Sequence, residues 1–212
     1  SSSTSTAEYN IAVGTTALDA VTTGDGNTAT GHSALGSNTE GYNNTAMGYQ
    51  ALRDNSTGIN NTALGRATLA TSTGSKNTAI GSYALAANTT AESNTATGYM
   101  ALRFNTTGSA NTTNGYQAGY ANTTGNHNAF FGKQTGKANT TGTENTFIGA
   151  DAGIANTTGA GNTFMGIYSG ASNTTANDNV FVGGGSGSSN TTGTRNVFLG
   201  RIAGEANTTA ND

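Results

Sequence analysis

Polar and apolar residues follow one short pattern along the whole chain. In a typical copy, NTATGYMALRFNTTGSA at residues 94–110, Asn at position one is followed by Ala or Phe at position three, a usually apolar residue at position four and Gly at position five. The copies begin at Asn10, Asn27, Asn44, Asn61, Asn77, Asn94, Asn111, Asn128, Asn145, Asn162, Asn179 and Asn196. Successive copies start 17 residues apart, except that Asn77 follows Asn61 after 16.

This repeat predicts an all-β fold, a parallel β-solenoid in which each copy forms one coil. Seventeen residues are too few for a helix-pair repeat. The copies lack the i, i+4 apolar pattern of a helix, and Gly and Asn recur too often for helix interiors. We expect a short strand at NTAMG (44–48) and its equivalents, a second extended piece through ALRDN (51–55), and a turn at NTTG.

The tetrapeptide NTTG marks a corner that returns in coil after coil, for example at residues 105–108, 122–125 and 139–142. Identical residues at one position of stacked coils can join their side-chain amides and hydroxyls into ladders. Asn and Gly also tolerate the left-handed backbone that tight corners demand. We therefore interpret the recurring tetrapeptide as one corner that is formed again in each coil.

The copies are expected to form one continuous domain that contains two kinds of coil. Residues 1–9 are expected to be the end of a preceding coil, residues 10–110 contain Ala/Leu-type coils, and residues 111–212 contain Phe/Gly-type coils. Positions three and nine are Ala and Leu in the first six coils, as in Ala79 with Leu85, and Phe and Gly in the last five, as in Phe147 with Gly153. Since cores tolerate changes that keep total volume, this swap predicts that the two positions touch inside the coil. Duplication of two ancestral copies would give the same correlation without contact.

Position four should then point outward, because side chains alternate along a strand. It is nevertheless mostly apolar, and a strand apolar on both faces is buried on both. The row predicts a homo-oligomer interface made by Val13, Met47, Leu64, Ile80, Phe131, Ile148, Met165, Val182 and Leu199. Thr30, Thr97 and Asn114 interrupt the row, as register-fixing polar layers or as tolerated substitutions.

Composition narrows the choice of partners. Of the 212 residues only 9% are charged, and the net charge of −3 provides no basic stripe for nucleic acid and no polybasic cluster for a membrane surface. No apolar run is long enough to insert into a membrane. The sequence contains no signal peptide, so we expect any export signal to lie outside it. The last copy closes at Asp212 without a cap, which predicts a section of a longer protein or end-to-end stacking.

Candidate chemistry is sparse, and we expect neither an enzyme nor a cofactor. His32 and His127 are six copies apart, and the acidic residues form no paired-carboxylate set. GGGSG at 183–187 lacks the Lys-Ser/Thr and the helix of a phosphate loop. No metal site is expected either, because calcium-binding β-rolls carry a ladder of Asp and here Asp151 and Asp178 are isolated.

Two sets of residues are candidates for modification or recognition. NTT triplets have the form of glycosylation acceptors at Asn88, Asn105, Asn122, Asn139, Asn156, Asn173, Asn190 and Asn207. Glycans on coils about 4.8 Å apart would collide, so turn ladders are the competing interpretation. Tyr residues at the variable positions suit contact with a protein or a glycan, namely Tyr49, Tyr83, Tyr99, Tyr116, Tyr120 and Tyr168.

The segments NTAMGYQAL (44–52), NTAIGSYAL (77–85) and NTATGYMAL (94–102) resemble the head repeats of trimeric autotransporter adhesins. They resemble still more closely the Asn-Thr-Ala-x-Gly repeats of phage tail fibres, and the resemblance covers residues 10–212. It implies a homotrimeric β-roll with left-handed coils, whose NTAxG strands gather around the threefold axis. The adhesin repeat is shorter than 17 residues, and the Phe/Gly coils from residue 128 onward depart further.

Together these features predict a non-enzymatic extracellular fibre segment: the head or shaft of a trimeric adhesin or phage tail fibre, at a cell surface or on a virion. Its partners would be its own copies and a cell-surface protein or glycan. The alternative is a structural filament that assembles end to end without a receptor. Ice binding through a Thr ladder such as Thr89, Thr106 and Thr123 is a third hypothesis.

Overall fold

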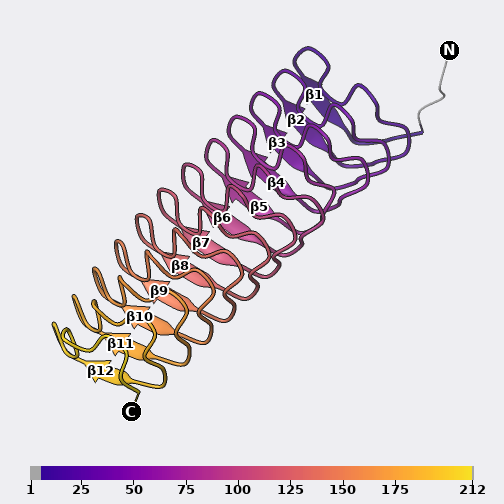
Figure 1. Ribbon diagram of the computed structural model, residues 1–212. Helices are drawn as coiled ribbons and strands as arrows, with labels where there is room; N and C mark the ends of the chain where they lie inside the picture. Colours follow the sequence, from indigo (N-terminus) through magenta and orange to yellow (C-terminus); the bar gives the residue numbers. More distant parts are fainter. Residues whose placement is uncertain (1–5, 212) are drawn as a thin grey trace. The chain divides into compact units, whose positions relative to one another are not determined.

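The computed structural model describes residues 6–211, where short strands are joined by turns (Figure 1). The chain divides into two compact units, Ser1–Thr107 and Gly108–Asp212, and each is described by itself. The first unit holds β1 (Ile11–Val13), β2 (Thr28–Thr30), β3 (Thr45–Met47), β4 (Thr62–Leu64), β5 (Thr78–Ile80) and β6 (Thr95–Thr97). The second holds β7 (Thr112–Asn114), β8 (Ala129–Phe131), β9 (Thr146–Ile148), β10 (Thr163–Met165), β11 (Val180–Val182) and β12 (Val197–Leu199).

Within each unit the strands pair in parallel, in chain order and in register with the repeat. Ala46 pairs with Ala63 in the first unit, and Phe147 pairs with Phe164 in the second. The 16-residue copy keeps this register, because Ala63 pairs with Ala79. The predicted parallel β-solenoid is therefore confirmed.

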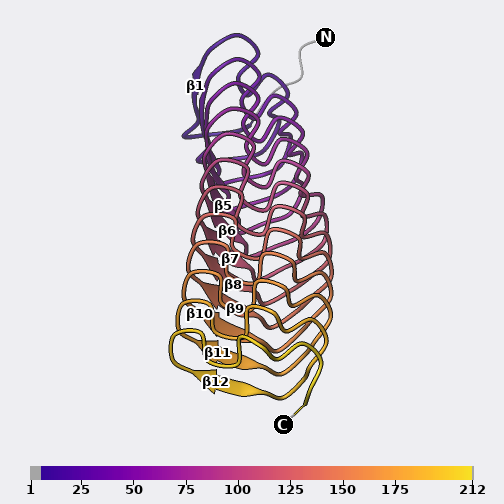
Figure 2. The same cartoon turned by 60° about the vertical axis from the view of Figure 1, so that its left-hand side comes forward.

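Backbone hydrogen bonds join neighbouring coils well beyond the strands. The amide of Leu35 donates to the carbonyl of Ala51 at 3.0 Å, and that of Thr39 donates to Ser56 at 3.0 Å, both outside any strand. Figure 2 shows the turns of each unit stacked in the same order as its strands. Since most of the coil takes part in such bonds, three strand residues per coil are enough to build the sheet.

The predicted tail of a preceding coil falls partly inside this description. The amide of Thr6 donates to Thr22 and that of Gly26 donates to Glu8, so residues 6–9 pair with the coil that follows them. Residues 1–5 of the predicted tail, and Asp212 at the end of the last copy, lie outside the described residues.

The prediction of a second extended piece through ALRDN (51–55) is wrong. Residues 49–54 form consecutive turns, and the φ angles of Gln50 and Leu52 are 58° and 50°. A residue in this left-handed region cannot continue an extended strand. The coil therefore bends at position nine, inside the segment expected to be extended, and at position seven, just before it.

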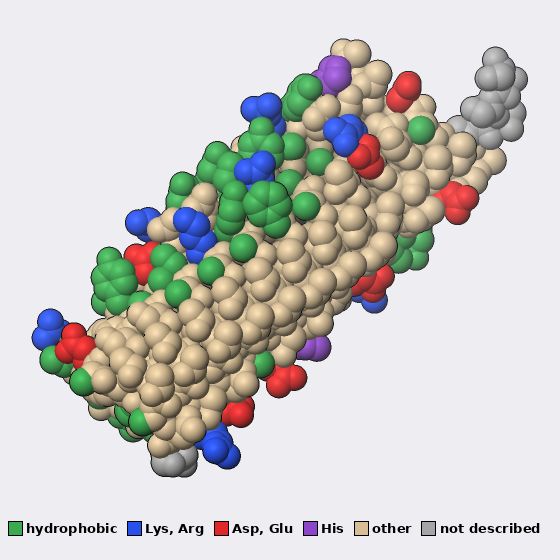
Figure 3. All heavy atoms as spheres, in the orientation of Figure 1, with side chains coloured by type: hydrophobic (Ala, Val, Ile, Leu, Met, Phe, Trp, Pro, Cys, Tyr) green, Lys and Arg blue, Asp and Glu red, His purple; other side chains and the backbone are tan. Residues whose placement is uncertain are grey.

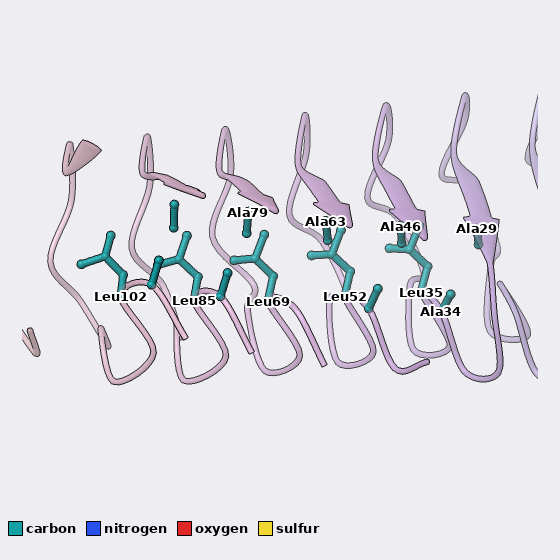
Figure 4. Packing of buried hydrophobic residues seen from close by; sticks show 14 of the residues in the cluster. Ala29, Ala34, Leu35, Ala46, Leu52, Ala63, Leu69, Ala79, Leu85 and Leu102 are labelled. Atoms are coloured by element: carbon teal, nitrogen blue, oxygen red, sulfur yellow. The ribbon is translucent and has the colours of Figure 1, made fainter. Parts of the chain in front are cut away.

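In the first unit, position nine supplies the core. Leu35, Leu52, Leu69, Leu85 and Leu102 are fully buried, and their branched ends point toward the Ala side chains of the strands (Figure 4). The contact predicted between positions three and nine is thus observed in the Ala/Leu coils.

In the second unit, position three supplies the core. Phe147 lies between Phe130 and Phe164, with ring centroids 5.1 and 4.7 Å away. A Cβ on Gly153 would lie only 2.5 Å from Cε2 of Phe147, so the ring occupies the space that a position-nine side chain would need. The contact prediction is confirmed here as well, since the glycine and the ring of one coil touch.

The two core types also differ in backbone strain. Position nine is left-handed in both, with a φ of 51° at Leu85 and 56° at Gly153. A left-handed conformation costs a residue with a Cβ about 1–2 kcal/mol, and glycine avoids this cost. At position nine the Leu coils therefore carry strain that burial of the leucine offsets, whereas the Phe coils avoid strain at this position.

The explanation expected for the NTTG corner needs correction. Its Asn and Gly are not left-handed; the Asn serves as a hydrogen-bond donor instead. Asn38 of the corner and Asn27 at position one both donate from Nδ2 to the carbonyl of Gly41, at 2.9 and 2.8 Å. A Cβ on Gly41 would lie 2.5 Å from the carbonyl oxygen of Gly58 in the next coil, so close approach of the coils requires the glycine.

Candidate functional site

The outer face of each sheet carries the apolar position-four row. On β2 to β11 each member follows a buried position-three residue and therefore points away from the core; on the end strands the preceding Ala12 is exposed and Phe198 is partly buried. All of them are exposed by 38% to 67% except Val182, which is partly buried: Val13, Met47, Leu64, Ile80, Phe131, Ile148, Met165 and Leu199. Of the polar interruptions, Asn114 is exposed while Thr30 and Thr97 are partly buried. The row is an apolar surface that a second protein surface could cover.

The turns after the strands, at positions six to eleven, form a second surface that we call the loop edge. Of the predicted recognition residues, Tyr49, Tyr99, Tyr116 and Tyr168 are exposed there, while Tyr83 and Tyr120 are partly buried. Figure 3 shows hydrophobic side chains next to Lys or Arg side chains on the surface of the molecule.

Arginines that the sequence analysis did not single out organise the loop edge of the first unit. The guanidinium of Arg66 lies 5.9 Å from the ring centroid of Tyr49 and 5.4 Å from that of Tyr83. The guanidinium of Arg103 lies 5.2 Å from Tyr83 and 5.1 Å from Phe104. We call Tyr49, Arg66, Tyr83, Arg103 and Phe104 the aromatic–arginine column. Tyr49, Arg66 and Tyr83 stand at positions six and seven of successive copies, whereas Arg103 stands at position ten and Phe104 at position eleven, so the sequence carried only part of this signal.

The column extends at one end to His32, whose ring stacks on Tyr49 with centroids 5.3 Å apart. Nδ1 of His32 lies 3.0 Å from Oγ of Ser33, which in turn lies 2.9 Å from Oγ1 of Thr16. Both hydrogen bonds are exposed, and no carboxylate takes part in this contact. We therefore interpret His32 as part of the stacked surface.

Asp54 neutralises the charge of Arg53, another arginine on the loop edge. Nε of Arg53 donates to Oδ1 of Asp54 at 2.6 Å, and Nη2 donates to Oδ2 at 2.5 Å. Hydrogen bonding from Arg53 lowers the pKa of the Asp54 carboxyl below its usual value. In the described part of the chain, by contrast, neither Arg66 nor Arg103 lies within ion-pair distance of a carboxylate.

The corner Asn residues proposed as glycosylation acceptors point into the coil. All are fully buried except Asn207, which is partly buried: Asn88, Asn105, Asn122, Asn139, Asn156, Asn173 and Asn190. Nδ2 of Asn139 donates to Oδ1 of Asn122 and to the carbonyl of Gly142, and Asn156 repeats this arrangement one coil later. A glycan on such a nitrogen would require the side chain to leave this ladder.

The ladder is interrupted in the 16-residue copy, where Ser72 occupies the corner position. Oγ of Ser72 accepts from Nδ2 of Asn88 at 2.9 Å and from the amide of Gly74 at 3.2 Å. Serine has no side-chain amide that could donate to the next Asn of the ladder. Oδ1 of Asn55 is therefore left buried without a hydrogen-bond partner. Two more buried side-chain oxygens lack a partner among the described residues: the hydroxyl of Thr113, at position three of the seventh copy, and Oδ1 of Asp151.

The Thr ladder considered for ice binding is engaged with the backbone. Oγ1 of Thr89 donates to the carbonyl of Thr106, and Oγ1 of Thr123 donates to that of Thr140, each at 3.0 Å. These hydroxyl protons are therefore not free to order water.

Residues 6–211 contain no pocket and no group of three His, Asp or Glu residues placed to hold a metal ion. The same residues include no helix that is long and apolar enough to cross a membrane. A scan against protein-family models and searches of the curated proteins and of the solved structures found no match.

Proposed function

We propose that this chain is a non-enzymatic segment of an extracellular homotrimeric fibre, of the kind found in adhesin heads and phage tail fibres. In this assembly the position-four rows of three copies face one another, and the coils are left-handed, as the resemblance of the NTAxG segments implies. The repeated coils present the same outward surfaces many times, so that weak contacts with a cell surface add up through multivalency.

The single observation that carries the proposal is the exposed apolar row on strands whose other face is already buried. Completing the burial of a half-exposed Ile or Leu contributes about 1 kcal/mol. Several such side chains stand on the outer face of each unit, so their combined burial would stabilise an association along the sheet. Thr30, Thr97 and Asn114 would then lie at the same interface, where a polar layer selects one register.

Sedimentation equilibrium of the purified chain tests the assembly. A trimer has three times the 21.0 kDa of one chain, 63 kDa. We expect this mass for the native protein and a loss of the trimer when Ile80 and Ile148 are both replaced by Lys. The matched control replaces Ile167, which is exposed on the loop edge, by Lys and should leave the mass unchanged.

A monomer at micromolar concentration would contradict the proposal. Filaments that grow from the purified protein, seen by negative-stain electron microscopy, would favour the structural-filament alternative. Attachment of the trimer to cells, lost when the trimer is dissociated, would support multivalent adhesion.

A further inference from the structure

The aromatic–arginine column presents positive charge that the protein itself does not neutralise. Arg66 is exposed and Arg103 is partly buried, and neither has a carboxylate partner in the part of the chain that the structure describes. Arg53 shows the alternative on the same edge, since Asp54 binds its guanidinium through two hydrogen bonds. Two arginines of the column thus retain hydrogen-bond donors for an anion from outside the chain.

The rings hold these guanidinium groups in place. Tyr83 lies in the coil between those of Arg66 and Arg103, and its ring centroid is 5.4 Å from one guanidinium carbon and 5.2 Å from the other. Tyr49 in the preceding coil contacts Arg66, and Phe104, the next residue in the chain, contacts Arg103. A stacked guanidinium keeps its N–H groups in its own plane, where they can form two parallel bonds to a carboxylate or a sulfate. Because the rings restrict the arginines beforehand, less side-chain entropy is lost on binding.

The spacing of the two cations indicates a polymer with sparse charges. Arg66 and Arg103 lie two coils apart, which is roughly 10 Å at about 4.8 Å per coil. A nucleic acid carries denser charge and binds through many phosphate contacts, more than the two arginines of the column can supply. The ring faces are already covered by guanidinium groups, so a ligand would meet the arginine donors and the Tyr hydroxyls. Acidic sugars offer the matching groups, which are well-separated anions and many hydroxyls.

We propose that the aromatic–arginine column is a binding site for an acidic polysaccharide, whose carboxylate or sulfate groups pair with Arg66 and Arg103. This inference rests on the proposed attachment function for its biological role, but the site lies within one unit of one chain. Its binding can therefore be measured whether or not the chain forms a trimer.

The test is biolayer interferometry of the full chain against immobilised polygalacturonate, a sparsely sulfated dextran sulfate, neutral dextran and single-stranded DNA. We expect binding to one or both acidic polysaccharides, none to dextran, and weaker binding to DNA. Polygalacturonate alone would identify carboxylate sugars as the ligand, and dextran sulfate alone would identify sulfated sugars. The double variant R66Q/R103Q should bind at least about tenfold more weakly, because two charge-assisted contacts are lost.

Two further variants separate a specific site from general charge. R195Q/R201Q removes two exposed arginines of the second unit and changes the net charge from −3 to −5, as R66Q/R103Q does, and it should bind as the native chain. R66K/R103K keeps the charge but loses the planar fork, and its affinity should fall between the native chain and the glutamine variant. Thermal unfolding followed by circular dichroism checks that each variant is folded.

No binding to either acidic polysaccharide would overturn the inference, as would equal losses in the two glutamine variants or equal affinity for DNA. A trimer that attaches to cells but binds neither polysaccharide would overturn this inference and leave the proposed function standing. A monomer that binds polygalacturonate through Arg66 and Arg103 would do the reverse.

Discussion

Exchanging the two core types within one coil should show that positions three and nine fill a shared volume. The perturbation is Phe147→Ala, Gly153→Leu and the two combined, which converts one Phe/Gly coil into an Ala/Leu coil. Phe147 is fully buried and stacked on two neighbouring rings, so its truncation should cost about 3–5 kcal/mol. Gly153→Leu alone places a Cβ 2.5 Å from the ring, which adds about 1–3 kcal/mol of overpacking to about 1–2 kcal/mol of left-handed strain.

The combined variant should be much less destabilised than the sum of the two. With the ring removed, the leucine introduced by Gly153→Leu would occupy the vacated space, as Leu85 does beside Ala79 in the first unit. The remaining costs are the left-handed backbone, about 1–2 kcal/mol, and two lost ring contacts, about 0.5–1.5 kcal/mol each. We therefore expect a favourable coupling free energy of at least about 2 kcal/mol between the two substitutions.

Equilibrium unfolding in urea, followed by circular dichroism at one fixed protein concentration, measures this coupling, since the stability of an oligomer depends on concentration. The control combines Phe147→Ala with Gly170→Leu, because Gly170 lies against Phe164 of its own coil. That pair should show no rescue. Additivity of Phe147→Ala and Gly153→Leu within about 0.5 kcal/mol would refute the shared volume and favour duplication without contact.

Three further predictions, which use five substitutions, probe the coil wall by the same unfolding assay. Asn139→Ala should destabilise more than Asn55→Ala by about 1 kcal/mol, because the acceptor oxygen of Asn55 already lacks a partner; equal losses would contradict the ladder. Gly149→Ala should cost more than about 2 kcal/mol, since its Cβ would lie 2.6 Å from the backbone of the next coil at a φ of 129°, whereas Gly184→Ala, with its nearest neighbour at 3.4 Å, should change stability little. Thr113→Val should stabilise by about 1 kcal/mol by removing a buried unpaired hydroxyl, and a loss of stability would show that the hydroxyl has a partner.

Much of the fold could be predicted because a solenoid repeats one local problem. A strict period places equivalent residues above one another, so the register of the strands followed from the spacing alone. The compensating volumes of Ala79 with Leu85 and of Phe147 with Gly153 indicated which positions share the interior. The outward direction of Ile148 then followed from the alternation of side chains along a strand.

Only part of the candidate site could be predicted in this way. The exposed tyrosines were recognised from their variable positions, but the arginines between them were not. Arg66, Tyr83 and Arg103 occupy positions six, seven and ten of three different coils. Their contact depends on how long side chains lean between neighbouring turns, which the spacing of the repeat does not reveal.

The sequence by itself determined the period, the stacking register and the choice of interior positions, because each is set by a residue pattern that recurs along the chain. The tertiary structure decided where the backbone becomes left-handed, why Asn38 and Gly41 are needed at the corner, and where the Asn ladder breaks at Ser72. These features arise from close approach between adjacent coils. At such distances an added Cβ would clash with the next coil, and a missing amide leaves an oxygen of the neighbouring coil without a hydrogen bond. Such contacts exist only once the coils are packed.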